Sequence, residues 1–159
     1  MKTYWLRKRI WLPRPREEIF EFFSNPSNLD RLTPPWLNFA ILSPATKPIV
    51  PGALLDYRLR IRGIPIRWQS EISAWDPPRN FVDRQTKGPY SLWIHEHTFE
   101  DGEDGTWVGD NVEYAVPGGG IVQKFLVAPD LERIFNYRHG VLEELFNPAQ
   151  TIPSRRTGT

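Results

Sequence analysis

The amino-acid sequence predicts a single α+β domain in which an antiparallel sheet packs against a long C-terminal helix. Two observations carry this prediction. Segments in which apolar and polar residues alternate, a pattern typical of strands, fill most of the chain up to residue 116. After Pro117 the apolar residues instead recur every three or four positions, which is the period of an amphipathic helix. Strands followed by a helix indicate an α+β fold, because a sheet with one solvated face needs a helix to cover the other.

The N-terminal region is expected to contain one strand and two short helices. Thr3–Leu12 alternates roughly between apolar and polar residues, as a strand does. A proline followed by acidic residues at positions 15–18 opens a helix, because proline suits the first helical position and acids suit the first turn. Asn25-Pro26 ends this helix, and a second short helix is expected over Ser27–Leu32.

Six further strands are predicted before the long helix. They are bounded by turn residues, and short turns between neighbours indicate antiparallel pairing. The expected strands are Trp36–Leu42, Ala53–Arg62, Pro65–Trp75, Asn80–Lys87, Ser91–Phe99 and Thr106–Val116.

The long helix is expected to begin at Pro129-Asp130. Its apolar face follows i, i+3 and i+4 spacing and contains one arginine. The face comprises Leu131, Ile134, Phe135, Arg138, Val141, Leu142 and Leu145. Residues 1–146 are therefore expected to form the domain, and the polar residues 147–159 a flexible tail.

The composition excludes several classes of function. The net charge is +1 with acids and bases interspersed, so no nucleic-acid binding is expected. The absence of cysteine excludes disulfide scaffolds and thiolate nucleophiles. The N-terminus lacks the apolar core of a signal peptide, and no apolar run approaches the ~18 residues of a transmembrane helix. A cytoplasmic protein without an integral membrane segment is expected.

The positions of the turns predict which side chains share the inward face of the sheet. A tight turn near Gly63-Ile64 would place Tyr57 opposite Ser70. The following turns extend this register across the sheet, and the inward face then contains three rows of residues. The rows are Tyr57, Ser70, Gln85, Trp93 and Tyr114; Leu55, Ile72, Asp83, His95 and Val112; and Ala74, Phe81, His97 and Asp110.

These rows bring together more polar side chains than a packed core accepts. A buried polar group without a partner costs a few kcal/mol. One interpretation is a partly hydrated ligand cavity with apolar walls and a few convergent polar groups. The other is a closed internal network, in which His95 bonds Asp83 and His97 bonds Asp110.

The central strands carry the string "W…I..W.PP..FVD.Q..GPY..W.H.H.F……D.V.Y..P". The matching positions are Trp68, Ile72, Trp75, Pro77, Pro78, Phe81, Val82, Asp83, Gln85, Gly88, Pro89, Tyr90, Trp93, His95, His97, Phe99, Asp110, Val112, Tyr114 and Pro117. This string and the order of the elements resemble the SRPBCC superfamily, also called START-like or helix-grip. Within it the bacterial polyketide cyclase/dehydrase-like branch is most similar. The resemblance covers about residues 2–146.

The resemblance implies a helix-grip fold, with a seven-stranded antiparallel sheet wrapped around the long C-terminal helix and a ligand cavity between them. It also implies binding or transport of a hydrophobic small molecule, such as a lipid, a polyketide or a quinone. No cofactor is expected. The residues expected to contact the ligand are Tyr57, Trp68, Ser70, Phe81, Gln85, Trp93, His97, Phe99 and Asp110.

The alternative is an enzyme of the cyclase or dehydrase type, since some relatives catalyse these reactions. A His–Asp pair can hold one imidazole tautomer and prepare it as a general base. His95 with Asp83 is the expected pair, and Tyr114 would donate to a developing enolate.

A metal site is the third interpretation of the two histidines. His95 and His97, with Asp83 or Asp110, could form a set of two histidines and one carboxylate. The aspartates expected beside the two imidazoles explain them without an ion, so no metal is predicted.

Two further features remain open at the level of sequence. Ile121–Val127, behind three glycines, is expected to form one or two helical turns, either packed in an ordinary way or serving as a mobile lid. Arg138 lies on the apolar face of the long helix, so it is expected either to reach the cavity or to cover its rim with its stem.

Overall fold

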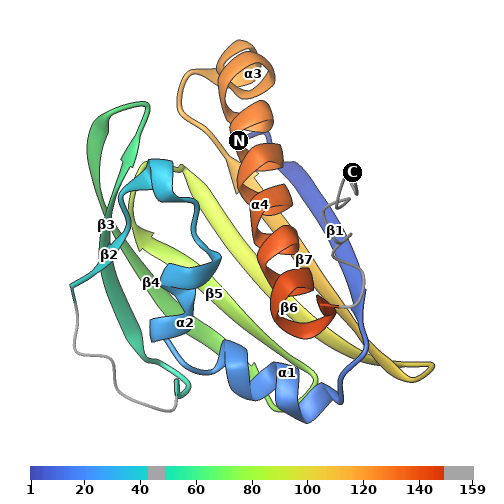
Figure 1. Cartoon of the computed structure of the whole chain (residues 1–159). Coiled ribbons are helices and arrows are strands. Elements are labelled where there is room, and N and C mark those ends of the chain that lie inside the picture. The colour runs from blue at the N-terminus through green and yellow to red at the C-terminus, as the bar shows by residue number, and fades with distance from the viewer. Residues whose placement is uncertain (43–48, 149–159) are drawn as a thin grey trace, which may run out of the picture.

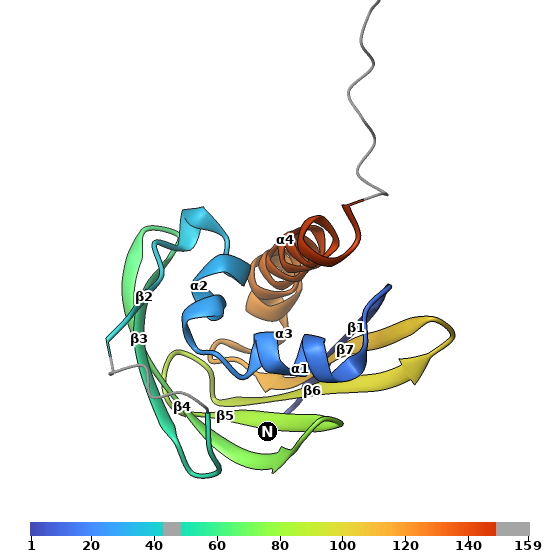
Figure 2. The ribbon, with the colours of Figure 1, turned by 60° about the horizontal axis from the view of Figure 1, so that its bottom comes forward.

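The computed structural model describes residues 1–42 and 49–148, which form a curved sheet with a long helix in its concave face (Figures 1 and 2). The sheet has seven strands in the order β1-β7-β6-β5-β4-β3-β2, and all neighbours are antiparallel. The strands are β1 (Tyr4–Leu12), β2 (Ala40–Ile41), β3 (Leu54–Ile61), β4 (Ile64–Asp76), β5 (Asn80–Lys87), β6 (Leu92–Gly102) and β7 (Gly105–Ala115). The predicted α+β class and the seven-stranded sheet are confirmed.

Helices lie on the concave side of the sheet, as Figure 2 shows. The helical segments are α1 (Arg16–Phe23), α2 (Ser27–Leu32), the 3-10 turn η1 (Pro35–Leu37), α3 (Gly119–Val122), the π-helical stretch η2 (Gln123–Val127) and α4 (Ala128–Phe146). The two short helices after the first strand and the long C-terminal helix are thus confirmed. None of the helices in the described ranges is long and apolar enough to cross a membrane.

The predicted strand Trp36–Leu42 is wrong over most of its length. Pro35 opens a 3-10 turn, and Asn38 then adopts a left-handed conformation with φ 46°. Two prolines before Trp36 fix the backbone in a turn, so only the two residues of β2 remain for pairing with β3. Most of the predicted flexible tail, residues 149–159, lies outside the described residues.

The first hairpin differs from its predicted register by two residues. Its turn consists of Arg62 and Gly63, with φ 50° and 79°, so Tyr57 lies opposite Trp68 rather than Ser70. Two successive residues with positive φ match the twist of the flanking strands in a two-residue hairpin loop. Because the shift is even, the same side chains still face inward.

The register of the central strands is confirmed. His95 lies opposite Asp83 on β5 and His97 lies opposite Asp110 on β7. One irregularity on β4, between Ile72 and Ala74, places Trp75 instead of Ala74 opposite Phe81. A β-bulge of this kind adds one residue to one strand, which a count based on turn positions does not anticipate.

The core forms two clusters along α4. In the first, called the lower cluster, Leu142 and Phe146 pack with α1 and Phe99. In the second, called the upper cluster, Leu131 and Phe135 pack with Trp68 and with the other ends of the same strands. Arg138 lies between these pairs on the same face of α4, since its spacing from each continues the helical period. A buried cation therefore stands where the two apolar clusters meet.

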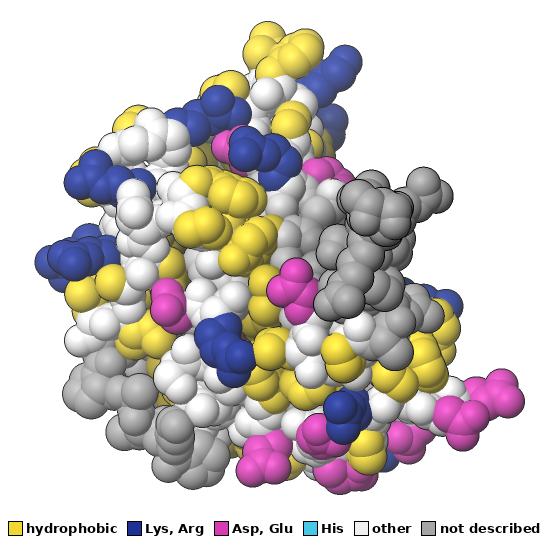
Figure 3. Space-filling model, viewed as in Figure 1, with side chains coloured by type: hydrophobic (Ala, Val, Ile, Leu, Met, Phe, Trp, Pro, Cys, Tyr) yellow, Lys and Arg dark blue, Asp and Glu magenta, His cyan; other side chains and the backbone are white. Residues whose placement is uncertain are grey.

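The segment Ile121–Val127 forms the predicted helical turns, and Val127 packs against the core, but three of its apolar side chains are exposed. Ile121, Phe125 and Leu126 are 76%, 64% and 43% exposed. Figure 3 shows apolar side chains at this tip of the molecule, whereas acidic side chains gather at the opposite end. No residue of the segment lines the cavity described below, so the structure does not place it as a closed lid.

Candidate functional site

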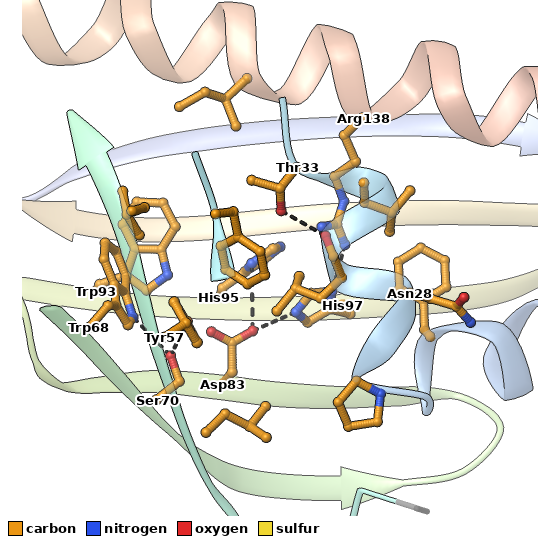
Figure 4. A pocket seen from close by; sticks show the side chains of 18 of the residues that line it. Asn28, Thr33, Tyr57, Trp68, Ser70, Asp83, Trp93, His95, His97 and Arg138 are labelled. Carbon is orange, nitrogen blue, oxygen red and sulfur yellow. Dashed lines mark hydrogen bonds and ion pairs between the residues drawn. The ribbon is translucent and has the colours of Figure 1, made fainter. Parts of the chain in front are cut away.

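A cavity of about 190 Å³ lies between α4, α2 and the concave face of the sheet (Figure 4). Most of its lining is apolar, and aromatic rings are prominent in it. These rings belong to Phe23, Phe39, Tyr57, Trp68, Phe81, Tyr90, Trp93 and Phe135. Such a volume admits several water molecules or part of a small apolar ligand.

Eight of the predicted site residues line the cavity. They are Tyr57, Trp68, Ser70, Phe81, Asp83, Trp93, His95 and His97. They come from β3, β4, β5 and β6, and alternation along each strand directs them to the concave face. The structure thus brings together residues that lie up to forty positions apart, as the inward rows predicted.

Four other predicted site residues lie outside the lining of the cavity. Gln85 holds the turn before β6, since its side chain donates to the carbonyl of Tyr90 at 2.8 Å and accepts from the N–H of Tyr90 at 3.2 Å. Phe99 is packed in the lower core cluster. Tyr114 accepts a hydrogen bond from Gln123 at 3.1 Å. Asp110 lies behind the histidines on β7 and contacts them from there.

The two histidines form crossed hydrogen bonds with the two aspartates. His95 Nε2 lies 2.8 Å from Asp110 Oδ1, and His97 Nε2 lies 2.6 Å from Asp83 Oδ2. The pairing expected for a closed network, His95 with Asp83 and His97 with Asp110, is therefore wrong, although the strand register is right. The partners are diagonal neighbours across the strands, a position that long side chains reach.

Ring stacking accompanies these crossed bonds. The imidazoles of His95 and His97 stack with their centroids 3.7 Å apart, and the other face of His97 stacks on Phe81 at 4.1 Å. His97 is thus held between two rings. Its orientation is set by packing as well as by hydrogen bonds.

Arg138 completes the polar cluster from the side of α4. One terminal nitrogen of its guanidinium donates to His97 Nδ1 at 3.2 Å and lies 3.6 Å from Asp110 Oδ1. His139 Nε2 approaches Asp110 Oδ2 at 3.3 Å. The sequence leaves two possible positions for the Arg138 side chain, in the cavity or over its rim, and the structure shows that it lines the cavity. The sequence feature that indicates this role is a charged residue on an otherwise apolar helical face.

The charges in the cluster follow from burial and from these contacts. Burial opposes ionisation of Asp83, but the hydrogen bond from His97 and the charges of the histidines and Arg138 lower its pKa below the ordinary value. Burial also opposes ionisation of Asp110, yet Arg138, His139 and His95 hold its pKa well below 3.8. Both aspartates are therefore carboxylates at neutral pH.

His97 is uncharged at neutral pH and is held in one tautomer. Burial, followed by the charge of His95, lowers its pKa to about 4. Arg138 can only donate hydrogen bonds, so Nδ1 of His97 must accept and the ring proton must lie on Nε2, facing the Asp83 carboxylate. The two neighbours thus determine which nitrogen carries the proton.

A second polar group lies in the cavity wall, and its members hydrogen-bond one another. Ser70 Oγ lies 2.7 Å from the Tyr57 hydroxyl and accepts from Trp68 Nε1 at 2.9 Å. Burial raises the pKa of Tyr57 and of Tyr90, so both phenols stay neutral. These groups can hydrogen-bond a ligand without adding charge to the wall.

The donor atoms of Asp83, His95 and His97 lie within 4.8 Å of one another, a spacing that a metal ion could bridge. Both nitrogens of His97 already have partners, however, and the Arg138 guanidinium stands beside one of them. A cation here would have to displace a hydrogen bond and approach a positive charge. The cluster therefore suits hydrogen bonding to an organic ligand better than metal binding.

Solved structures with the same fold come from bacteria and plants. A protein from Chromobacterium violaceum superposes with a TM-score of 0.72 at 14% identity, covering 91% of this chain and 99% of the other. The major latex-like protein 151 from Panax ginseng gives 0.68 at 13% identity, covering 92% and 99%. A START superfamily protein from Mycobacterium smegmatis gives 0.63 at 16%, covering 89% and 98%. These similarities confirm the predicted helix-grip fold.

The comparison of sequences points to the same group of proteins. No curated protein matches this sequence. The family described as polyketide cyclase / dehydrase and lipid transport matches residues 12–136, which include every strand except β1 and most of the cavity lining. The predicted resemblance is thereby confirmed, and this chain belongs to the polyketide cyclase / dehydrase and lipid transport family.

Proposed function

We propose that this protein binds an apolar small molecule, such as a lipid, a polyketide or a quinone, in the cavity beneath α4. The observation that carries the proposal is the lining of this cavity, in which aromatic walls surround one polar floor formed by Asp83, His95 and His97. Ligand sites typically combine mostly apolar walls with a few convergent polar groups. The family description, which includes lipid transport, supports the same function.

The two ends of the cavity have different tasks in this proposal. Trp68 and Trp93 would contact the apolar body of the ligand, while the floor would fix the position of a polar group. Asp110 and Gln85 would act indirectly, because they hold His95 and the Tyr90 turn in place. A buried apolar body supplies affinity, and the polar group supplies orientation.

Native mass spectrometry of the protein purified from cells tests this function directly. The expected result is a bound apolar molecule that leaves under denaturing conditions. Ile134→Trp, on α4 in the cavity wall, should reduce the bound fraction because the larger ring occupies the ligand volume. Ile64→Trp is the matched control, since Ile64 is 62% exposed in the first hairpin and does not line the cavity.

Ligand-free protein can be examined with a panel of lipids, polyketides and quinones. Trp68 and Trp93 in the wall provide an intrinsic fluorescence signal for binding. A protein that is purified empty and whose fluorescence none of these compounds changes would contradict the proposal.

One observation favours a catalytic role as the second candidate function. Asp110 accepts the proton of His95 Nε2, which leaves Nδ1 of His95 without a hydrogen bond among the described residues, 3.6 Å from Asp83 Oδ2. A carboxylate that orients one imidazole nitrogen while the other is free is the arrangement of a general base. The pair would be His95 with Asp110, with Asp83 alongside.

Substitution of His95 tests the catalytic role separately from binding. His95→Gln should abolish cyclisation or dehydration of an identified ligand while the ligand still binds. Tyr114→Phe should have little effect, because the Tyr114 hydroxyl contacts Gln123 and the residue does not line the cavity. Unchanged turnover in His95→Gln would eliminate this role for His95.

A further inference from the structure

Asp83 is the most accessible polar side chain of the cavity floor. Its side chain is 17% exposed, compared with 7% for His95, 6% for His97 and 8% for Arg138. Asp83 lies on the concave face of the sheet and lines the cavity, so this accessible area faces the ligand volume. A ligand that reaches the floor therefore meets this carboxylate first.

One oxygen of Asp83 is occupied and the other is open. Oδ2 accepts the hydrogen bond from His97 at 2.6 Å and lies 3.6 Å from His95 Nδ1. Within residues 1–42 and 49–148, no hydrogen bond reaches Oδ1. A carboxylate oxygen can only accept, so the floor offers an unused acceptor to whatever enters the cavity.

The surrounding charges disfavour a ligand that carries a carboxylate. Asp83 and Asp110 are both ionised, and Arg138 is shared between them. Nη2 of Arg138 already donates to His97 and lies 3.6 Å from Asp110 Oδ1. A third carboxylate would be repelled by two anions in a poorly screened site.

A cationic head group is disfavoured for the opposite reason. Arg138 is positive and close enough to Asp83 to lower the pKa of its carboxyl group. An ammonium group would also lose its hydration on entering apolar walls, and that cost is large for a compact ion. The group that fits an open acceptor between unlike charges is a neutral donor.

We propose that the cavity selects apolar molecules that present a hydroxyl group, alcoholic or phenolic, to Asp83 and discriminates against the corresponding free acids. The inference rests on the proposed binding function and names the ligand class for the same site. The hydroxyl donates to Asp83 Oδ1, and the aromatic walls around Trp68 and Trp93 surround the apolar body. The ordered His97 tautomer keeps the second oxygen of Asp83 occupied, which directs the ligand to the first.

The test compares four probes with the same ten-carbon chain: 1-decanol, decanoate, decylamine and decane. Binding is measured at pH 7 by tryptophan fluorescence and by isothermal calorimetry on the ligand-free full chain. We expect 1-decanol to bind about tenfold more tightly than decane, because a hydrogen bond to a charged acceptor is worth about that ratio. We expect decanoate to bind about tenfold more weakly than 1-decanol, because of repulsion by the floor.

Asp83→Asn removes the charge and keeps the shape of the side chain. The ratio of 1-decanol to decanoate affinity should fall toward one in this variant, mainly because decanoate binds more tightly. Asp104→Asn is the matched control in the exposed β6–β7 turn and should leave the ratio unchanged. The comparison of probes in the unaltered protein needs no variant, so it remains decisive if Asp83→Asn folds poorly.

The outcomes separate the ligand class from the function itself. Equal or tighter binding of decanoate or decylamine, or equal binding of decane and 1-decanol, would overturn the hydroxyl class while leaving an apolar binding site. Failure of all four probes, together with an empty protein by native mass spectrometry, would overturn the binding function and the inference with it.

Discussion

At the scale of single residues, His97 is the side chain on which the polar floor depends. It donates to Asp83, accepts from Arg138 and is stacked between Phe81 and His95. Each contact requires the neutral Nε2–H tautomer or agrees with it. Protonation of His97 would place a hydrogen on Nδ1 against the guanidinium, so an acidic solution should disturb the entire cluster.

The free energy of unfolding should therefore fall as the pH falls from about 6.5 to about 4. The pKa of His97 is 6.5 ordinarily and about 4 in the folded protein, so the unfolded chain binds more protons in this window. One such group contributes a slope of about 1.4 kcal/mol per pH unit. Below this window Asp83 and Asp110 add to the loss, because their folded pKa values are also lowered.

Urea denaturation at a series of pH values measures this slope, and His97→Gln should reduce it. The chain has three histidines, so the His97 imidazole can be followed separately by NMR. A stability that stays constant between pH 6.5 and pH 4, or a His97 resonance that titrates near 6.5, would refute the assignment.

At the scale of elements, α4 contributes side chains both to the core and to the candidate site. Its one buried face carries Leu131 and Phe135 toward the upper cluster, Arg138 toward the floor, and Leu142 and Phe146 toward the lower cluster. The helical stretch that precedes it is different, because Ile121 and Phe125 are exposed. A continuous helical segment thus has a structural part and a part that contributes little to packing.

Replacing leucine by alanine at two positions of this helical segment should change the free energy of unfolding by very different amounts. Leu142→Ala should lower the free energy of unfolding by about 2–5 kcal/mol, because Leu142 is fully buried and a cavity remains. Leu126→Ala should lower it by about 0.5 kcal/mol, because Leu126 is 43% exposed. Chemical denaturation of both variants gives the comparison, and similar losses would contradict the division of the segment.

The first hairpin supplies a second prediction at this scale. Gly63 has φ +79°, a left-handed conformation that costs an L-residue about 1–2 kcal/mol, so Gly63→Ala should destabilise the protein by about that amount. Gly140, in α4, has open space where the β-carbon of an alanine would lie, and Gly140→Ala should stabilise by about 0.5–1 kcal/mol. Thermal unfolding of the two variants should therefore shift in opposite directions, and a shift in the same direction would refute the turn geometry.

At the scale of the whole molecule, one edge of the sheet is formed by the first strand of the chain, which pairs with the last strand. β1 pairs with β7, so Tyr4 lies opposite Tyr114, and β6 joins this pair to the strands that carry Asp83 and Trp68 (Figure 1). The curved sheet and α4 enclose the cavity only after these distant segments have met. The cavity is consequently a property of the complete fold, and a ligand in it should stabilise that fold as a unit.

Ligand binding should raise the unfolding free energy of the entire domain. A ligand that binds only the folded state, at a free concentration of about one hundred times its Kd, adds about 2.7 kcal/mol. Differential scanning fluorimetry with 1-decanol should show a concentration-dependent rise in Tm for the unaltered protein and for Ile64→Trp, and a smaller rise for Ile134→Trp. Equal rises in all three proteins would show that the ligand binds elsewhere.

The sequence by itself determined the antiparallel sheet, the long helix and most of the inward-facing residues, because strand alternation and helical period are local properties of the chain. The bulge on β4 is the exception, since it brings Trp75 rather than Ala74 to the inward face. Even the two-residue error in the first hairpin left the inward face unchanged, since the side-chain period is two. The predicted strand Trp36–Leu42 failed where two prolines impose a turn. The placement of His95, His97 and Asp83 together on the inward face of the sheet could thus be predicted from the sequence.

Only the tertiary structure decided which partners these side chains choose. The crossed bonds of His95 to Asp110 and of His97 to Asp83 depend on rotamers and ring stacking, which strand register does not specify. Arg138 reaches His97 because α4 lies over the sheet at that point, and His97 occupies one oxygen of Asp83 but not the other. Distances between packed elements are set by all the side chains between them at once, and no local pattern in the chain records them.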